Sequence, residues 1–357
     1  MQNKKTKILF SGGGTGGSVS PLLAIYDALD KEKYHFWWIG TKNGPEREML
    51  KDKSVDYRYI QSGKLRRYFS WKNFTDPLFI FLGFLESFYF LLFRRQDLII
   101  TAGSFVSVPL AWAAHILRIP VMIHQQDIRP GLANKLMAKS AFVITTAFEK
   151  SLNDYKKKAV WTGNPVRKNI RVEKDYEYFD FNGLVPTVLI MGGGTGAQKI
   201  NRLVYESLDN LSKKVQIIHV AGRGKMEKEI HNPNYRQTEF LNETDIAKAY
   251  AIADIVVSRC GIASLSELSY LSKASILIPM PDSHQEDNAR VFEDAGAAIV
   301  LNEKKLDKYS FVISIENLLG DDNKLTKIKE KMGKMMKRNP EEEIIKLIEK
   351  KLKKNAA

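Results

Sequence analysis

Short apolar runs alternate with segments of helical length along almost the whole of this 357-residue chain. In the first half the runs occupy residues 7–11, 35–39, 55–60, 97–101, 121–124, 142–145 and 159–161. In the second half they occupy residues 187–191, 215–220, 238–241, 254–258, 274–279 and 298–301. Such alternation is typical of buried parallel strands with helices on both faces of the sheet. The pattern therefore predicts an α/β protein.

Each half opens on the same unit, an apolar run that breaks into glycines and resumes as a helix. The first glycine segment is Gly12-Gly-Gly-Thr-Gly-Gly17 and the second is Gly192-Gly-Gly-Thr-Gly-Ala197. Glycine lets the backbone approach a ligand closely, and the helix N-terminus that follows offers N–H groups and partial positive charge. We expect two phosphate-binding loops, in two Rossmann-like doubly wound domains that face a central cleft.

The domain boundary is predicted where the alternation fails. Residues 163–168 interrupt it, and the polar, acidic stretch 172–184 that follows contains the expected hinge. The chain is long enough for two full cores. We predict an N-terminal domain at residues 1–165 and a C-terminal domain at residues 166–337. The last helix, about residues 338–357, is expected to pack back on the N-terminal domain.

A dinucleotide enzyme is the first alternative, because both glycine segments match its fingerprint. That fingerprint needs an acidic residue at the end of the second strand to hold a ribose. Residues 40–42 and 221–223, which occupy those positions, contain none, although Arg223 suits a 2′-phosphate. A Walker loop is excluded, since no Gly-Lys-Ser/Thr follows either glycine segment.

Composition narrows the class further. The single cysteine, Cys260, excludes an internal disulfide framework and fits a reducing compartment. No signal peptide is visible. The six histidines lack metal-ligand spacing and no hydrolase elbow is present, so we expect no bound metal and no cofactor. The net charge of +14 is compatible with nucleic acid, an anionic membrane or an acidic ligand.

A basic and then strongly apolar segment favours the membrane. Lys64, Arg66, Arg67 and Lys72 occur without acids, and residues 77–93 are apolar nearly all round. Seventeen residues containing Glu86 are short for a transmembrane helix. One interpretation is a buried crossover helix. The other is that its first turns and the basic loop rest on an anionic bilayer, while the far end lies in the core.

A denser group of polar residues lies in the C-terminal half. Residues 258–267 leave a strand, turn at Gly261 and open a helix that carries Glu267 in its second turn. The N-terminus of that helix can take a pyrophosphate, and Glu267 can accept both hydroxyls of a ribose. A capped helix with a solvent-facing Glu is the simpler alternative. Gln285 and Asn288 follow in the next loop and helix, where amides suit sugar hydroxyls.

In these motifs, together with Gly163-Asn-Pro-Val-Arg167 and His284-Gln-x-x-Asn-Ala289, the chain resembles the MurG family from about residue 7 to residue 300. The resemblance implies a glycosyltransferase-B fold. It also implies inverting, metal-independent transfer of GlcNAc from UDP-GlcNAc to the 4-hydroxyl of undecaprenyl-pyrophosphoryl-MurNAc-pentapeptide. That reaction turns lipid I into lipid II in peptidoglycan synthesis, and so serves cell wall biogenesis, cell shape and division. The enzyme would be peripheral at the cytoplasmic face of the cell membrane, with no nucleic acid partner.

The resemblance also implies roles for individual residues. The N-terminal domain would take the acceptor and the membrane, with Thr15, Gly16 and Gly17 lining the acceptor pyrophosphate. The C-terminal domain would take the UDP-sugar. Its implied contacts are Arg167, Gly194 and Thr195 for phosphates, Ile262, Ala263, Ser264, Leu265 and Ser266 for uracil and pyrophosphate, Glu267 for ribose, Gln285 for GlcNAc, and Leu241 and Asn288 as further substrate contacts.

The base is the least determined residue, because this chain departs from the family pattern there. Ser18 stands where the family usually has histidine, and Gln125 where it has glutamate. Serine is a far weaker base than histidine. We therefore expect Asp127, which the resemblance places against the GlcNAc or the acceptor, to take the proton, and name His124 as the reserve. The simpler alternative for His124 is a structural histidine at a strand end. These departures leave two alternatives: a related glycosyltransferase with another lipid-linked acceptor, and a UDP-sugar-binding subunit without catalysis.

Overall fold

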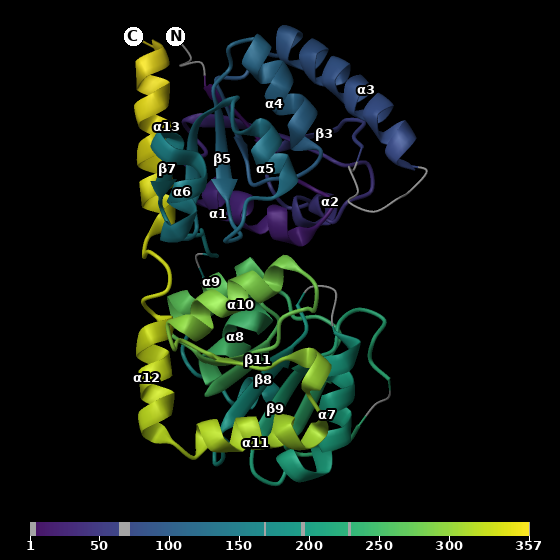
Figure 1. Cartoon of the computed structure of the whole chain (residues 1–357), viewed down its shortest axis with the longest axis vertical. Helices are drawn as coiled ribbons and strands as arrows, with labels where there is room; N and C mark the ends of the chain where they lie inside the picture. The colour runs from purple at the N-terminus through teal and green to yellow at the C-terminus, as the bar shows by residue number, and fades with distance from the viewer. Residues whose placement is uncertain (1–4, 64–71, 168, 194–196, 228–229, 357) are drawn as a thin grey trace. The chain divides into compact units, whose positions relative to one another are not determined.

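The computed structural model describes residues 5–63, 72–167, 169–193, 197–227 and 230–356 (Figure 1). The chain divides into two compact units. Unit 1 contains residues 1–165 and 337–357, and unit 2 contains residues 166–336. The chain thus enters unit 2 once and returns to unit 1 at its end.

Unit 1 is built on a parallel seven-stranded sheet in the order β3-β2-β1-β4-β5-β6-β7. The strand order reverses between β1 and β4, and ligands of doubly wound sheets bind at the carboxyl ends of strands at such a point. The strands are β1 Thr6–Ser11, β2 Tyr34–Gly40, β3 Asp56–Tyr59, β4 Leu98–Thr101, β5 Val121–Gln125, β6 Ala141–Thr146 and β7 Ala159–Trp161.

Helices cover both faces of this sheet, which is why its strands read as continuous apolar runs. In β1, Ile8 and Phe10 face one core while Leu9 faces the other, as the two-residue period of a strand requires. The helices are α1 Ser20–Ala28, α2 Glu46–Met49, α3 Lys72–Phe93, α4 Ser107–Ile116, α5 Leu132–Met137, α6 Leu152–Tyr155 and α13 Pro340–Ala356, with 3₁₀ turns at Gly16–Ser18, Glu149–Ser151 and Lys156–Lys158.

Unit 2 repeats the design with a parallel six-stranded sheet in the order β10-β9-β8-β11-β12-β13. Its strands are β8 Thr187–Met191, β9 Gln216–Val220, β10 Tyr235–Thr238, β11 Ile255–Ser258, β12 Ala274–Leu277 and β13 Ile299–Val300. Its helices are α7 Gln198–Leu211, α8 Glu243–Ile252, α9 Ile262–Leu271, α10 His284–Asp294, α11 Lys308–Leu319 and α12 Asp322–Met332, with 3₁₀ turns at Glu177–Phe179 and Glu303–Lys305.

The predicted parallel α/β sheets are confirmed, and β10 is the strand whose predicted position was wrong. The expected strand covered residues 238–241, whereas β10 covers Tyr235–Thr238. This edge strand has only Tyr235 fully buried, with its hydroxyl 2.8 Å from His219 Nδ1. Its other side chains are polar, whereas Phe240 and Leu241 just beyond it are apolar. The prediction followed this apolar pair and was therefore displaced along the chain.

Helix α3 is less buried than the predicted crossover helix would be. It packs beside α4 on the outside of unit 1 (Figure 1). Its segment Asp76–Phe93 is long and apolar enough to cross a membrane, and 28% of that segment is buried. Phe90 and Leu91 belong to the core, but Phe93 at the far end is 80% exposed. Exposed apolar side chains therefore occur near both ends of this segment, at residues 78–81 and 89–93, and not in its first turns alone.

Candidate active site

The most complete polar group in unit 2 surrounds Glu267, which lies in α9 and is only 5% exposed. Its Oε1 is 3.0 Å from Arg167 Nη2, and its Oε2 accepts a hydrogen bond of 3.0 Å from the Tyr250 hydroxyl. Arg167 comes from the start of the unit and Tyr250 from α8. Three distant parts of the sequence thus meet at one carboxylate.

Burial and pairing act in opposite directions on this carboxyl group. Burial raises the pKa of Glu267, while the Arg167 guanidinium and the Tyr250 hydrogen bond lower it. The pKa of Tyr250 is raised well above its usual value by burial and by the neighbouring Glu267. Tyr250 therefore stays protonated and donates to the carboxylate. No motif in the sequence pointed to Tyr250, because this tyrosine lies among the buried apolar positions of an ordinary helix.

At the start of α9, backbone N–H groups are available to a ligand and most side chains are not. Leu265 and Ser266 are buried, and the Ser266 hydroxyl donates to the carbonyl of Ile262 at 2.7 Å. Ala263 and Ser264 are half-buried. Gly261 is the N-cap, and among the described residues no side chain caps the first turn. The free N–H groups of that turn suit an anion such as a pyrophosphate.

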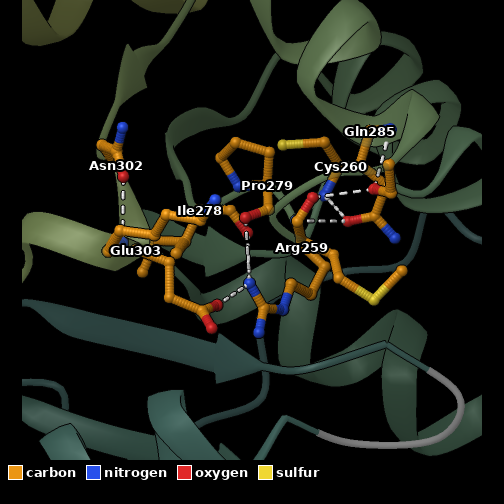
Figure 2. Close-up of polar contacts among 10 residues, drawn as sticks. Arg259, Cys260, Ile278, Pro279, Gln285, Asn302 and Glu303 are labelled. Carbon is orange, nitrogen blue, oxygen red and sulfur yellow. Dashed lines mark hydrogen bonds and ion pairs between the residues drawn. The ribbon is translucent and has the colours of Figure 1, made fainter.

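Figure 2 shows how the loop before α9 is held. Arg259 donates to the carbonyls of Ile278 and Pro279, each at 3.1 Å, and forms an ion pair with Glu303. The guanidinium is thereby committed to the ends of β12 and β13. Arg259, one of the motif residues, thus fixes the loop before α9 through its Nη1 atom.

Two amide side chains of α10, those of Gln285 and Asn288, also hold this loop. Only Gln285 keeps a polar group for a ligand. Asn288 is fully buried and its Nδ2 donates to the carbonyl of Cys260 at 3.2 Å. Gln285 accepts at Oε1 from the N–H groups of Cys260 at 3.2 Å and Met280 at 3.1 Å. With Oε1 committed, the Gln285 amide can present its NH₂ group to a ligand. Because Asn288 is fully buried and holds the loop, we do not retain it as a sugar contact.

The first glycine loop lies in unit 1 and has an exposed tip. Thr15 and Gly17 are exposed, Gly16 is half-buried, and a Cβ added at either glycine would meet nothing within 4 Å. Ser18 is buried, and its hydroxyl donates to the carbonyls of Thr15 and Gly13 at 3.2 and 3.4 Å. The hydroxyl is thus used to shape the loop, which does not fit a catalytic base.

His124 at the end of β5 also has a structural environment. It is fully buried, with Nδ1 2.9 Å from Thr145 Oγ1 and Nε2 2.8 Å from Asn164 Oδ1. Burial lowers its pKa to about 4, so the ring is neutral near pH 7. Because both ring nitrogens are engaged away from solvent, we do not retain His124 as the reserve base. Asp127, three residues further on, is half-buried.

Some predicted contacts cannot be placed. Gly194 and Thr195 of the second loop, and Lys64, Arg66 and Arg67 of the basic segment, lie outside the described residues. Leu241 is half-buried immediately before Asn242, whose side chain caps α8. Within the described ranges, no group of three His, Cys, Asp or Glu side chains could hold a metal ion.

Both units match known protein families. Residues 8–146 match the N-terminal domain of glycosyltransferase family 28, and residues 187–348 match its C-terminal domain. A relative from Clostridium tetani is 36% identical over 355 residues, which cover 97% of this chain and 98% of that protein. One from Staphylococcus carnosus is 38% identical over 323 residues, covering 88% and 89%. Both are named UDP-N-acetylglucosamine–N-acetylmuramyl-(pentapeptide) pyrophosphoryl-undecaprenol N-acetylglucosamine transferase.

Solved structures give the same fold. MurG of Acinetobacter baumannii superposes with a TM-score of 0.75 at 23% identity, covering 97% of this chain and 99% of that one. A calicheamicin glycosyltransferase also gives 0.75, at 12% identity, covering 99% and 100%. The expected glycosyltransferase-B fold is thereby confirmed.

Proposed function

Because this chain belongs to glycosyltransferase family 28 and, within it, to the MurG N-acetylglucosaminyltransferases, we propose that it converts lipid I to lipid II. GlcNAc would pass from UDP-GlcNAc to the 4-hydroxyl of undecaprenyl-pyrophosphoryl-MurNAc-pentapeptide, with inversion. The structural observation that carries the proposal is the buried Glu267 carboxylate between Arg167 and Tyr250, at the start of a helix with free N–H groups.

The donor's binding mode follows from that group. The N-terminal turn of α9, including Ser264, takes the pyrophosphate. Glu267 accepts from the ribose diol, because each carboxylate oxygen keeps a second acceptor site beside its contact with Arg167 or Tyr250. Arg167 is half-exposed, so its guanidinium is also available to the donor, and its charge stabilises the departing UDP. The NH₂ group of Gln285 donates to a hydroxyl of GlcNAc.

The acceptor hydroxyl must lose a proton as it attacks the donor's anomeric carbon. Asp127 supplies the base, because Ser18 and His124 are committed to hydrogen bonds inside unit 1. Gln125 helps to fix this segment, since its Nε2 donates to the backbone carbonyl of Asp127 at 2.7 Å. A carboxylate on a fixed segment is suited to general base catalysis.

The decisive assay is transfer of labelled GlcNAc from UDP-GlcNAc to a short-chain lipid I analogue, with and without EDTA. We expect a β-linked disaccharide product at the same rate in both. Binding of UDP-GlcNAc without transfer to this or any other lipid-linked sugar would instead identify a non-catalytic subunit. Transfer to another lipid-linked sugar, with none to lipid I, would identify a different acceptor.

We further propose that unit 1 attaches peripherally to the cytoplasmic face of the cell membrane through α3. The exposed apolar side chains of this helix are Leu78, Phe79, Phe81, Tyr89, Leu92 and Phe93. Exposed Arg94 and Arg95 follow them directly, and the basic cluster of Lys64, Arg66, Arg67 and Lys72 precedes them in sequence. An apolar face flanked by cations suits an interface with anionic lipid.

Replacing Leu78, Phe81 and Phe93 by serine is expected to release the protein from anionic vesicles without unfolding it. Neutralising Lys64, Arg66, Arg67 and Lys72 should weaken binding as well, by about 1 kcal/mol per residue at low salt. Vesicle sedimentation measures both effects. The matched control replaces Tyr309 and Ile313, which are exposed on α11 of unit 2. Sedimentation that ignores salt and all of these substitutions would contradict attachment through α3.

A further inference from the structure

A buried carboxylate lies against the first glycine loop. Glu46 begins α2 and has no exposed surface. Its Oε1 accepts from the N–H and from the hydroxyl of Thr41, both at 2.6 Å, and its Oε2 accepts from the N–H of Gly14 at 3.1 Å. The carboxylate therefore takes one of the loop N–H groups that the sequence assigned to a bound phosphate.

The surrounding glycines leave space for this carboxylate and for nothing larger. A Cβ at Gly13 would lie 2.2 Å from Glu46 Oε1, and one at Gly44 would lie 2.0 Å from Oε2. Gly14 has a φ of +79°, which side chains rarely adopt. The glycines of the first loop thus accommodate an internal acid as well as the turn itself.

Other side chains hold the same loop from behind. Trp38 Nε1 donates to the carbonyl of Gly12, and Ser104 Oγ donates to that of Gly13, both at 2.9 Å. The base of the loop is therefore hydrogen-bonded on several sides, while its tip at residues 15–17 stays accessible.

We propose that Glu46 is a positioning residue that occupies, from inside the protein, the anion position of the first glycine loop. A ligand phosphate at the Gly14 N–H would meet a negative charge already seated there. The acceptor pyrophosphate is thereby restricted to the tip, residues 15–17, whose shape Glu46 holds. This assignment of the acceptor rests on the proposed function, whereas the bracing of the loop does not.

The test compares Glu46→Gln with Glu48→Gln, an exposed carboxylate on the same short helix. In Glu46→Gln an NH₂ group replaces one acceptor oxygen, so an N–H of Gly14 or Thr41 loses its partner. Amide hydrogen exchange of residues 12–18 should become faster. The kcat/KM for the lipid I analogue should fall by about 10²-fold, as when a reacting group moves by roughly 1 Å. The Kd for UDP should stay unchanged, and Glu48→Gln should resemble the wild type in every measurement.

Wild-type exchange and wild-type kcat/KM in a folded Glu46→Gln would overturn the proposal. If the wild type transfers no GlcNAc but exchange still accelerates in Glu46→Gln, the proposed function fails and the bracing role stands. A double-mutant cycle covers the case of a variant too unstable to assay. Gly13→Ala should lower the melting temperature in the wild type and much less in Glu46→Ala, where the carboxylate is gone; equal losses in both backgrounds would also overturn the proposal.

Discussion

Replacing Glu267 by alanine is expected to weaken UDP binding by about 1–3 kcal/mol, roughly 5- to 150-fold in Kd. The ribose diol loses its acceptor in a buried site. In the free protein the same change leaves the buried Tyr250 hydroxyl and the Arg167 guanidinium without their shared partner. Titration calorimetry on the folded variant measures the loss.

Two variants make this result specific. Glu243→Ala removes an exposed carboxylate from α8 in the same unit and should bind UDP as the wild type does. Tyr250→Phe keeps the carboxylate and removes one hydrogen bond to it, so its loss should be smaller than that of Glu267→Ala. Unchanged UDP affinity in a folded Glu267→Ala would remove the ribose assignment. NADPH, titrated in parallel, is expected not to compete.

Replacing Asp127 by asparagine is expected to lower turnover by about 10²–10⁴-fold, the range for loss of one general base. Asparagine keeps the size of the side chain but cannot accept the proton of the 4-hydroxyl. UDP affinity should stay nearly unchanged, because the donor contacts proposed above belong to unit 2. Single-turnover transfer to the lipid I analogue, with UDP calorimetry on the same preparation, separates the two effects.

Ser18→His tests the same assignment independently, since histidine is the usual family residue there. A large gain in rate would mean that this chain works with a weakened base. No gain, together with an inactive Asp127→Asn, would place the proton transfer at Asp127. A fully active Asp127→Asn would exclude this carboxylate and leave water as the proton acceptor.

The sequence predicted the elements better than the contacts among them. The strands at the sheet centres stood out because both faces are buried, so their apolar runs are continuous. The polar edge strand β10 had no such pattern and was misplaced. Glu267 was recognised from its place in α9, but its pairing with Arg167, 100 residues earlier, depends on tertiary packing. The spacing of residues within a motif does not indicate a contact between distant parts of the chain.

The role of Glu46 also depends on tertiary packing, and the sequence motifs did not indicate it. The dinucleotide fingerprint requires an acid directly after the second strand, and residues 40–42 contain none. The acid comes at Glu46, where α2 turns its side chain back toward the strand end and the glycine loop. It serves the protein's own backbone and not a ribose. The sequence left His124 open as either a reserve base or a structural residue, because only the folded structure shows that Asn164 and Thr145 enclose it.

The return of the chain to unit 1 has a consequence for synthesis on the ribosome. Ile344 and Ile348 of α13 are fully buried in the core that α1 and β1 share. Unit 2 is continuous in sequence, so its core needs no residue outside 166–336. Unit 1 begins first, but its core stays incomplete until α13 has left the ribosome. The unit that begins first is therefore completed last, the reverse of the usual N-terminal order.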